Sequence, residues 1–453
     1  MEKMPSLPSK QDSRELILVT GARGYIASQL IPRLLERGLR VRCLVRNPQH
    51  LHARQWFADV EVVCGDLTQP ESILPALQGV STAYYLVHSM SSGNHYIEQD
   101  LQVARSFAAS ALQAGVGHII YLGGLADPQA KIARHMRSRI LTGDALRTTD
   151  VPVTEFRTGV IVGPGSISFE MIRFLTEQFP LILCPRWMPN LSQPIAIQNI
   201  LDYLLAALDM PNPESRVFEV GGSEVITYAE TMLRYAKLRG LQRKLLILPI
   251  NPVWLLAAFL ANFTPVPASI TRPLVEGLCN HSIVRNDSAL QAFPHIHPMD
   301  YDTAVRDSLS KLDPRLVEPL WRQIKPAVHA LKHAGFCILQ RQTLLEANPG
   351  SVLEAIQLIY ASGESYKLES SKGHETGSGH EHILLMRSKR KLPGQLWMEW
   401  RVSSLKKETR ISQAVLFAPK GLPGFLWWCG LGPWLRLSQW VAFRKLLRQV
   451  DKV

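Results

Sequence analysis

The chain has 453 residues, which is too long for one ordinary domain, so two or three domains are expected. Apolar residues make up 46% of the sequence, and the formal charge of +12 is spread along the whole chain. This charge allows contact with nucleotide phosphates or an anionic membrane surface. The sequence has no nucleic-acid-binding motif, so no nucleic-acid partner is expected. The six cysteines have no CxxC spacing and no secretory context, which predicts reduced thiols in a cytoplasmic protein. The histidine pairs at 50/52, 295/297 and 380/382 lack the helical spacing of a metal pair, so no metal site is expected.

The first strong pattern follows residues 1–14, which we expect to form a disordered tail. Residues 16–20 predict a buried strand, a glycine turn follows it, and a helix is expected to begin near Tyr25. In a dinucleotide-binding turn, the first glycine makes the tight bend and the second lets the backbone approach the pyrophosphate, which faces the helix N-terminus. The predicted cofactor-binding residues of the turn are Thr20, Gly21, Ala22, Arg23, Gly24, Tyr25 and Ile26.

The end of the second predicted strand, residues 41–45, indicates which dinucleotide binds. An NAD-specific site would place an acidic residue there to hold the ribose 2′-OH. Here the strand is followed by Arg46, and no Asp or Glu lies between residues 36 and 59. With Arg42 inside the strand and Arg23 in the turn, these guanidinium groups suit a 2′-phosphate. The sequence favours NADP(H) and keeps NAD(H) as the alternative; ordinary solvated arginines are the other explanation.

Predicted strands and helices continue to alternate along the next 200 residues. The strands are expected at 60–64, 82–87, 118–122, 153–157 and 217–220, and the helices between them at 70–77, 97–114, 136–148 and 200–208. This alternation predicts an α/β Rossmann fold, with a parallel sheet and helices on both faces. Further dinucleotide contacts are expected at the strand ends, from Asp66, Leu67, Val87, His88 and Gly123.

The pattern changes after the last of these elements. We expect a Rossmann domain with a substrate subdomain at 15–248, a helical extension at 249–334, and a C-terminal α+β domain at 335–453. The C-terminal strands are expected at 383–387, 396–402 and 411–417, before a final helix at 421–447. A polar Gly/Ser/His-rich segment at 370–382 is expected to be a loop.

Several of these blocks resemble known families. Residues 19–27, 84–90 and 121–125 together resemble the atypical short-chain dehydrogenase/reductases, a group of NAD(P)H-binding Rossmann proteins related to the NmrA-like proteins and to the Rossmann accessory subunit of complex I. The resemblance covers residues 14–298. Residues 392–400 and 411–422 resemble a domain of unknown function (DUF2867-like) that is often fused to such reductases. The resemblance implies a helix-grip arrangement that holds an apolar ligand.

The resemblance also implies a catalytic Tyr-x-x-x-Lys pair, which this chain lacks. No tyrosine lies between Tyr121 and Tyr203, so Lys131 has no partner four residues before it. His88 is then the candidate general acid, with a structural hydrogen-bonding role as its alternative. The basic residues at 131–139 either hold an anionic substrate or cofactor phosphate, or form a solvated helix face.

We therefore expect an NADP(H)-dependent oxidoreductase that acts on a lipophilic carbonyl or quinone-like substrate. The alternative is a non-catalytic dinucleotide-binding protein, either a redox sensor or an assembly scaffold. The partners expected are the dinucleotide and an apolar small molecule. Tryptophans at 427, 428, 434 and 440 among basic residues leave open either peripheral contact with the inner membrane surface or burial in the core of the final helix.

Overall fold

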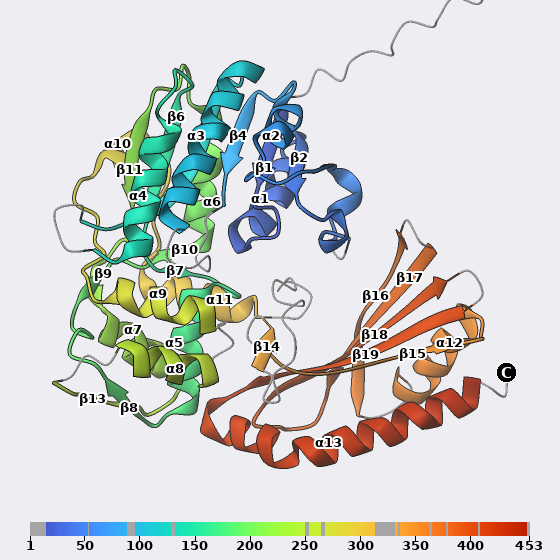
Figure 1. The fold of residues 1–453 in the computed structure, drawn as a ribbon. Helices are drawn as coiled ribbons and strands as arrows, with labels where there is room; N and C mark the ends of the chain where they lie inside the picture. The colour runs from blue at the N-terminus through green and yellow to red at the C-terminus, as the bar shows by residue number, and fades with distance from the viewer. Residues whose placement is uncertain are drawn as a thin grey trace, which may run out of the picture. The chain divides into compact units, whose positions relative to one another are not determined.

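The computed structural model describes residues 15–52, 54–87, 96–127, 132–249, 253–263, 268–312, 331–333, 336–361, 365–376, 379–405 and 408–450. The chain divides into two compact units (Figure 1). Unit 1 comprises residues 1–159, 197–223 and 282–298, and unit 2 comprises residues 160–196, 224–281 and 299–453. The domain boundaries expected from the sequence stay a prediction.

Unit 1 is built on a parallel seven-stranded sheet in the order β11-β6-β5-β4-β1-β2-β3. Its strands are β1 (Leu16–Thr20), β2 (Arg40–Val45), β3 (Glu61–Cys64), β4 (Thr82–Tyr85), β5 (His118–Gly124), β6 (Val153–Thr158) and β11 (Arg216–Val220). The strand order reverses between β1 and β4, which makes their carboxyl ends the topological switch point of the sheet. The predicted α/β Rossmann fold is confirmed.

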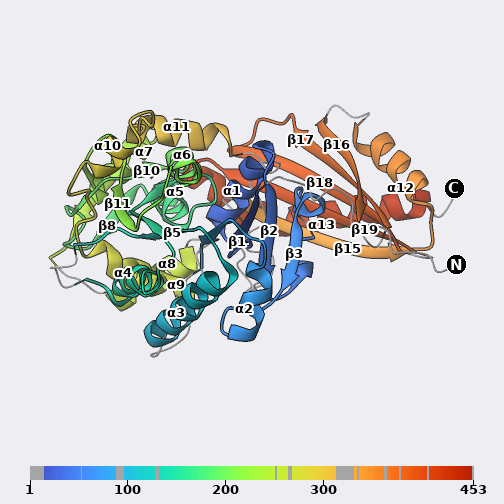
Figure 2. The same cartoon turned by 90° about the horizontal axis from the view of Figure 1, so that it is seen from above.

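Helices cover both faces of this sheet (Figure 2). The helices of unit 1 are α1 (Tyr25–Glu36), α2 (Pro70–Leu77), α3 (Tyr96–Ala114), α4 (Arg134–Leu146), α6 (Ile197–Ala206) and α10 (Ser288–Ala292). Helices α2, α3 and α4 pack side by side on one face, and α1 packs beside α6 on the other. Helix α3 buries Ala104, Phe107, Ala108 and Ala111, the apolar stripe that a helical period predicts.

The first part of unit 2 is mainly helical. It contains α5 (Ile167–Gln178), α7 (Tyr228–Leu238), α8 (Val253–Phe263), α9 (Ala268–Leu278) and α11 (Tyr301–Ser310). Three pairs of short strands connect them: β7 (Ile161–Val162) with β10 (Ile195–Ala196), β9 (Leu191–Ser192) with β12 (Ile226–Thr227), and β8 (Leu181–Cys184) with β13 (Lys244–Ile247). These pairs are not predictable from the sequence, because segments of two to four residues are too short to show a strand period.

The second part of unit 2 is an antiparallel sheet in the order β14-β15-β19-β18-β17-β16 with two helices. Its elements are β14 (Leu331–His333), β15 (Phe336–Leu345), α12 (Pro349–Ile356), β16 (Tyr366–Thr376), β17 (Gly379–Ser388), β18 (Gly394–Leu405), β19 (Glu408–Pro419) and α13 (Gly421–Val450). The prediction of a loop at 370–382 is wrong, since most of this segment forms the β16–β17 hairpin. Strand β16 is an edge strand, where polar side chains are tolerated.

Helix α13 lies along the antiparallel sheet. One face of the helix packs against the sheet, and another face is exposed. Trp428 stacks on Phe417 with ring centroids 5.5 Å apart, and Phe443 stacks on Trp400 at 5.8 Å. Trp434, by contrast, is 70% exposed. The tryptophans therefore divide between the core and the surface. Among the described residues, no helix is both long and apolar enough to cross a membrane.

Candidate functional site

The glycine turn begins where β1 ends, at the switch point of the sheet. Gly21 has φ of +68°, and a Cβ there would lie 2.6 Å from the carbonyl oxygen of Leu86, so only glycine fits. The N–H of Gly24 donates to the oxygen of Gly21 at 2.7 Å and closes the turn. A Cβ on Gly24 would meet only that oxygen within 4 Å among the described residues, so the space beside the backbone is open.

Thr20 and Val87 hold the turn against β4. The hydroxyl of Thr20 donates to the oxygen of Tyr84 at 3.0 Å and accepts from the N–H of Leu86 at 3.1 Å. Thr20 is fully buried and fixes the strand ends, while Cγ1 of Val87 lies 3.1 Å from the Cβ position of Gly21. His88 lies outside the described residues, so its role as general acid stays a prediction.

Helix α1 begins at Tyr25, as predicted, with Gly24 as its N-cap. Glycine offers no capping side chain, and the first turn carries no acidic residue. The N–H groups at this end and the positive end of the helix dipole are therefore suited to an anion. Ala22 and Ala27 are buried, which lets the helix lie close to the sheet.

Three guanidinium groups gather beside the turn: Arg23 in the turn, Arg46 just after β2, and Arg54. We call them the arginine cluster. Burial, followed by the charges of Arg46 and Arg54, lowers the pKa of Arg23. Nη2 of Arg54 donates to the oxygen of Arg23 at 3.4 Å, and Arg54 is only 7% exposed. Because the charges of Arg46 and Arg54 act on Arg23, an anion bound among the three groups would be attracted by all of them.

The structure corrects the membership of this cluster in two ways. Arg42 was expected to add a charge for the phosphate, but its Nε and Nη2 donate to Oε2 of Glu61 at 3.0 and 2.8 Å. Its Nη1 donates to the backbone oxygens of Ala76 and Gln78, so Arg42 ties β2 to β3 and to the end of α2. Arg54 was missed, because no regular pattern in the segment after β2 shows which way its side chain faces.

The remaining predicted contacts have structural partners of their own. Oδ1 of Asp66 accepts from the N–H of Thr68 at 3.0 Å, and Leu67 packs against the core of unit 1. Gly123 lies inside β5, which extends beyond its predicted end, and a Cβ there would lie 2.8 Å from Oε1 of the buried Glu155. These positions line the carboxyl edge of the sheet, and their contact with a dinucleotide stays a prediction.

The basic group at 131–139 divides between surface and interior, with Lys131 outside the described residues. Arg134 and Arg137 are exposed, as expected for a solvated helix face. His135 is buried, and burial together with the charge of Arg139 lowers its pKa to about 4. Nη2 of Arg139 reaches the oxygen of Leu122 at 3.5 Å. Within the part of the chain that the structure describes, no group of His, Cys, Asp or Glu is placed to hold a metal ion.

Comparisons with known proteins agree with this architecture. Residues 13–160 match the NmrA-like family. The photosystem II assembly factor Ycf39 of Trieres chinensis is 26% identical over 241 residues, which cover 52% of this chain and 72% of that protein. The ceramide reductase of Caulobacter vibrioides is 29% identical over 187 residues, which cover 40% of this chain and 56% of that protein.

Two solved structures share the fold. The triphenylmethane reductase of Citrobacter sp., complexed with NADP(H), has a TM-score of 0.52 and 23% identity, with 64% of this chain and 99% of that chain covered. The NADPH-dependent quinone oxidoreductase of Escherichia coli, complexed with NADPH, has a TM-score of 0.51 and 18% identity over 64% of this chain and 99% of that chain. Residues 13–160 thus match the NmrA-like family, and unit 1 has the Rossmann fold that these NADP(H)-binding reductases share.

Proposed function

We propose that this protein is an NADP(H)-dependent oxidoreductase that acts on a lipophilic carbonyl or quinone-like substrate. The arginine cluster beside the glycine turn is the observation that carries this proposal. NADP(H) brings a 2′-phosphate that offsets three nearby positive charges, whereas the ribose hydroxyl of NAD(H) offsets none of them. NAD(H) is therefore the weaker ligand.

The open backbone of the turn and the uncapped end of α1 suit the pyrophosphate, because both present N–H groups to it. The bound cofactor supplies the hydride. The proposed dinucleotide contacts are Thr20, Gly21, Ala22, Arg23, Gly24, Tyr25, Ile26, Arg46, Arg54, Asp66, Leu67, Val87, His88 and Gly123. The chain is similar to a ceramide reductase and to a quinone oxidoreductase, which supports the lipophilic substrate class.

The test is a titration of NADPH and NADH into the full chain and into Gly24→Val. We expect NADPH to bind at least tenfold more tightly than NADH, since a charge-assisted hydrogen bond contributes roughly 1.5–3 kcal/mol. The valine side chain would occupy the space beside the turn, so the variant should bind neither cofactor. Gly430→Val, in open surroundings on α13, is the matched control and should bind both normally. Equal affinity for the two cofactors would refute the cofactor choice.

A second function is a non-catalytic dinucleotide-binding scaffold. It is favoured by the missing Tyr-x-x-x-Lys pair and by the similarity to an assembly factor over 72% of that protein. Incubation with NADPH and a lipid extract distinguishes the two functions. Oxidation of NADPH with a changed metabolite supports the enzyme, and tight binding without turnover supports the scaffold.

We also propose peripheral contact with an anionic membrane, made by the outer face of α13. Trp434 is 70% exposed, Leu437 is 52% exposed and Val441 is 55% exposed, all on one side of the helix. The helix carries four basic residues and no acidic residue. The guanidinium carbon of Arg444 lies 3.8 Å from the ring centroid of Trp440. Exposed aromatics beside basic side chains are typical of helices that lie in a membrane interface.

A further inference from the structure

Two buried nitrogen atoms of helix α4 have no hydrogen-bond partner among the described residues: Nδ1 of His135 and Nε of Arg139. The side chain of His135 is 7% exposed, and Arg139 is partly buried. A buried polar atom without a partner is costly and rare in a folded protein. The two residues are four apart on the helix, so their side chains lie on the same face, one above the other. One acceptor atom between them would satisfy both nitrogen atoms.

The two residues lie at the edge of unit 1 where ligands of such sheets bind. Cδ of Arg139, which is bonded to Nε, lies 3.1 Å from the Cβ position of Gly124, the last residue of β5. His135 is in the first turn of α4, which follows β5, and so lies at the same edge. Strand β5 pairs with β4, whose carboxyl end forms the switch point with β1. Ligands of open α/β sheets bind outside the carboxyl ends of the strands at this point.

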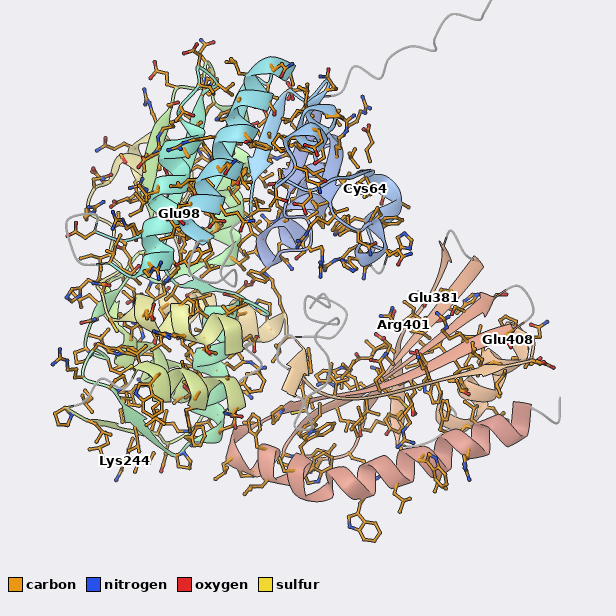
Figure 3. All side chains as sticks on the ribbon, in the orientation of Figure 1. Cys64, Glu98, Lys244, Glu381, Arg401 and Glu408 are labelled. Carbon is orange, nitrogen blue, oxygen red and sulfur yellow. The ribbon has the colours of Figure 1, made fainter. Side chains whose placement is uncertain are left out.

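Hydrogen bonds to neighbouring elements fix this part of α4. The hydroxyl of Ser138 donates to Oδ2 of Asp100 on α3 at 2.9 Å, and the hydroxyl of Tyr121 on β5 donates to the backbone oxygen of Arg139 at 2.9 Å. Helices α3 and α4 pack side by side, and Figure 3 labels Glu98 in the first turn of α3. The nitrogen atoms on α4 are therefore held in place before a ligand binds, which favours their use in binding.

The chemistry of the pair favours a single uncharged oxygen atom as the acceptor. Nη2 of Arg139 donates to the oxygen of Leu122 at 3.5 Å, so Nε and Nη2 do not form a free fork for a carboxylate. Burial and the charge of Arg139 lower the pKa of His135 to about 4, so the imidazole is neutral at pH 7 and adds no charge for an anion. Leu125 and Ala126, which follow β5, are 1% and 4% exposed, and these apolar surroundings suit an apolar ligand.

We infer that Nδ1 of His135 and Nε of Arg139 donate hydrogen bonds to the carbonyl oxygen of an apolar ketone or aldehyde. This inference rests on the proposed reductase function and names the part of the substrate that α4 holds. Reduction adds a hydride from the bound cofactor to the carbonyl carbon, which oxidises the cofactor and moves the π electron pair of the C=O bond to the oxygen. The two N–H groups stabilise the negative charge that develops there, and the oxygen takes up a proton that comes from water.

The test compares two probes that differ only at the carbonyl group, 2-acetylnaphthalene and 2-ethylnaphthalene, by equilibrium dialysis against the full chain with NADP⁺. The wild type should bind the ketone at least tenfold more tightly than the hydrocarbon, and His135→Phe and Arg139→Met should each remove most of this preference. Arg137→Met, at an exposed position of the same helix, is the matched control and should keep the full preference. The ratio of the two affinities separates recognition of the oxygen from a general weakening of the fold.

Three results would overturn the inference. The first is a wild type that binds both probes equally or binds neither, which would mean that water satisfies the two nitrogen atoms. The second is an unchanged preference in the folded variants; if thermal unfolding shows that one variant does not fold, the other decides. The third is tighter binding of 2-naphthoate than of the ketone, which would make this a site for an anion. The proposed function fails separately, if the wild type prefers the ketone but does not oxidise NADPH in its presence.

Discussion

The carboxylate of Glu177 accepts a hydrogen bond from the backbone N–H of Gly421 at 2.6 Å, across 244 positions of the chain. Glu177 is 1% exposed near the end of α5, and Gly421 begins α13 with φ of +64°. The same carboxylate accepts from the hydroxyl of Tyr235 at 2.8 Å and from Nε of Arg239 at 2.6 Å. Phe425 also meets Phe174 with ring centroids 5.8 Å apart. The last helix is thus joined to the helical part of unit 2 by a buried, charge-assisted contact.

We expect Glu177→Gln to lower the free energy of unfolding by about 2–3 kcal/mol, because it removes the charge that Arg239 and the N–H of Gly421 share. Urea unfolding measures the change. Glu214→Gln breaks the exposed pair with Arg216 and is the control, with an expected effect below about 0.5 kcal/mol. Equal effects of the two substitutions would mean that the buried contacts of Glu177 contribute no more to the free energy of unfolding than an exposed ion pair does.

Arg46→Asp should weaken NADPH binding at least tenfold and leave NADH binding unchanged. The substitution replaces a positive charge of the arginine cluster with a negative charge, which repels the 2′-phosphate of NADPH. Calorimetric titration of both cofactors measures this. Arg105→Asp makes the same charge change on the exposed side of α3 and should leave both affinities unchanged. Equal losses for NADPH and NADH would remove Arg46 as the group that discriminates between them.

Acidification should destabilise the fold between pH 6.5 and 4. Burial lowers the pKa of His118 to about 4, and His135 has the same value for the reasons given above. In the unfolded chain the pKa of a histidine is about 6.5. Between pH 6.5 and 4 the unfolded chain therefore binds more protons than the folded chain, so the stability is full above pH 6.5 and is lost as the pH falls. Each histidine should lower the free energy of unfolding by about 2 kcal/mol between pH 7 and 5.

Urea unfolding at the two pH values measures this loss. His118 contacts the hydroxyl of Thr154 through Nε2 at 2.8 Å, so His118→Gln keeps a polar partner and removes the titration. The variant should show a smaller loss than the wild type. A wild-type stability that is the same at pH 7 and pH 5 would contradict the expectation.

Vesicle co-sedimentation tests the membrane face of α13. The wild type should bind vesicles with an anionic phospholipid more strongly than vesicles of phosphatidylcholine alone, because the helix carries only positive charges. Trp434→Ser with Leu437→Ser should reduce binding several-fold. Leu290→Ser, at a 48% exposed position on α10, is the control and should change nothing. Binding that is equal for both vesicle types, or absent, would refute the membrane contact.

The sequence by itself determined the Rossmann unit and the place of its glycine turn. These features are local: an apolar run predicts β1, glycines mark the turn, and the period of apolar residues predicts helices. The predicted bounds of α2 match the structure at both ends, and α1 begins at the predicted residue. Arg46 could be placed at the strand end for the same reason, since the end of an apolar run is visible in the sequence.

Only the tertiary structure decided what each face meets. Arg42 and Arg46 are equally basic in sequence, yet Arg42 pairs with Glu61, while the charge of Arg46 acts on Arg23 and lowers its pKa. Trp428 packs on the sheet and Trp434 faces outward, although both lie on one helix. The pattern of a sequence shows which residues share a face, whereas burial and pairing depend on segments far along the chain that fold against that face.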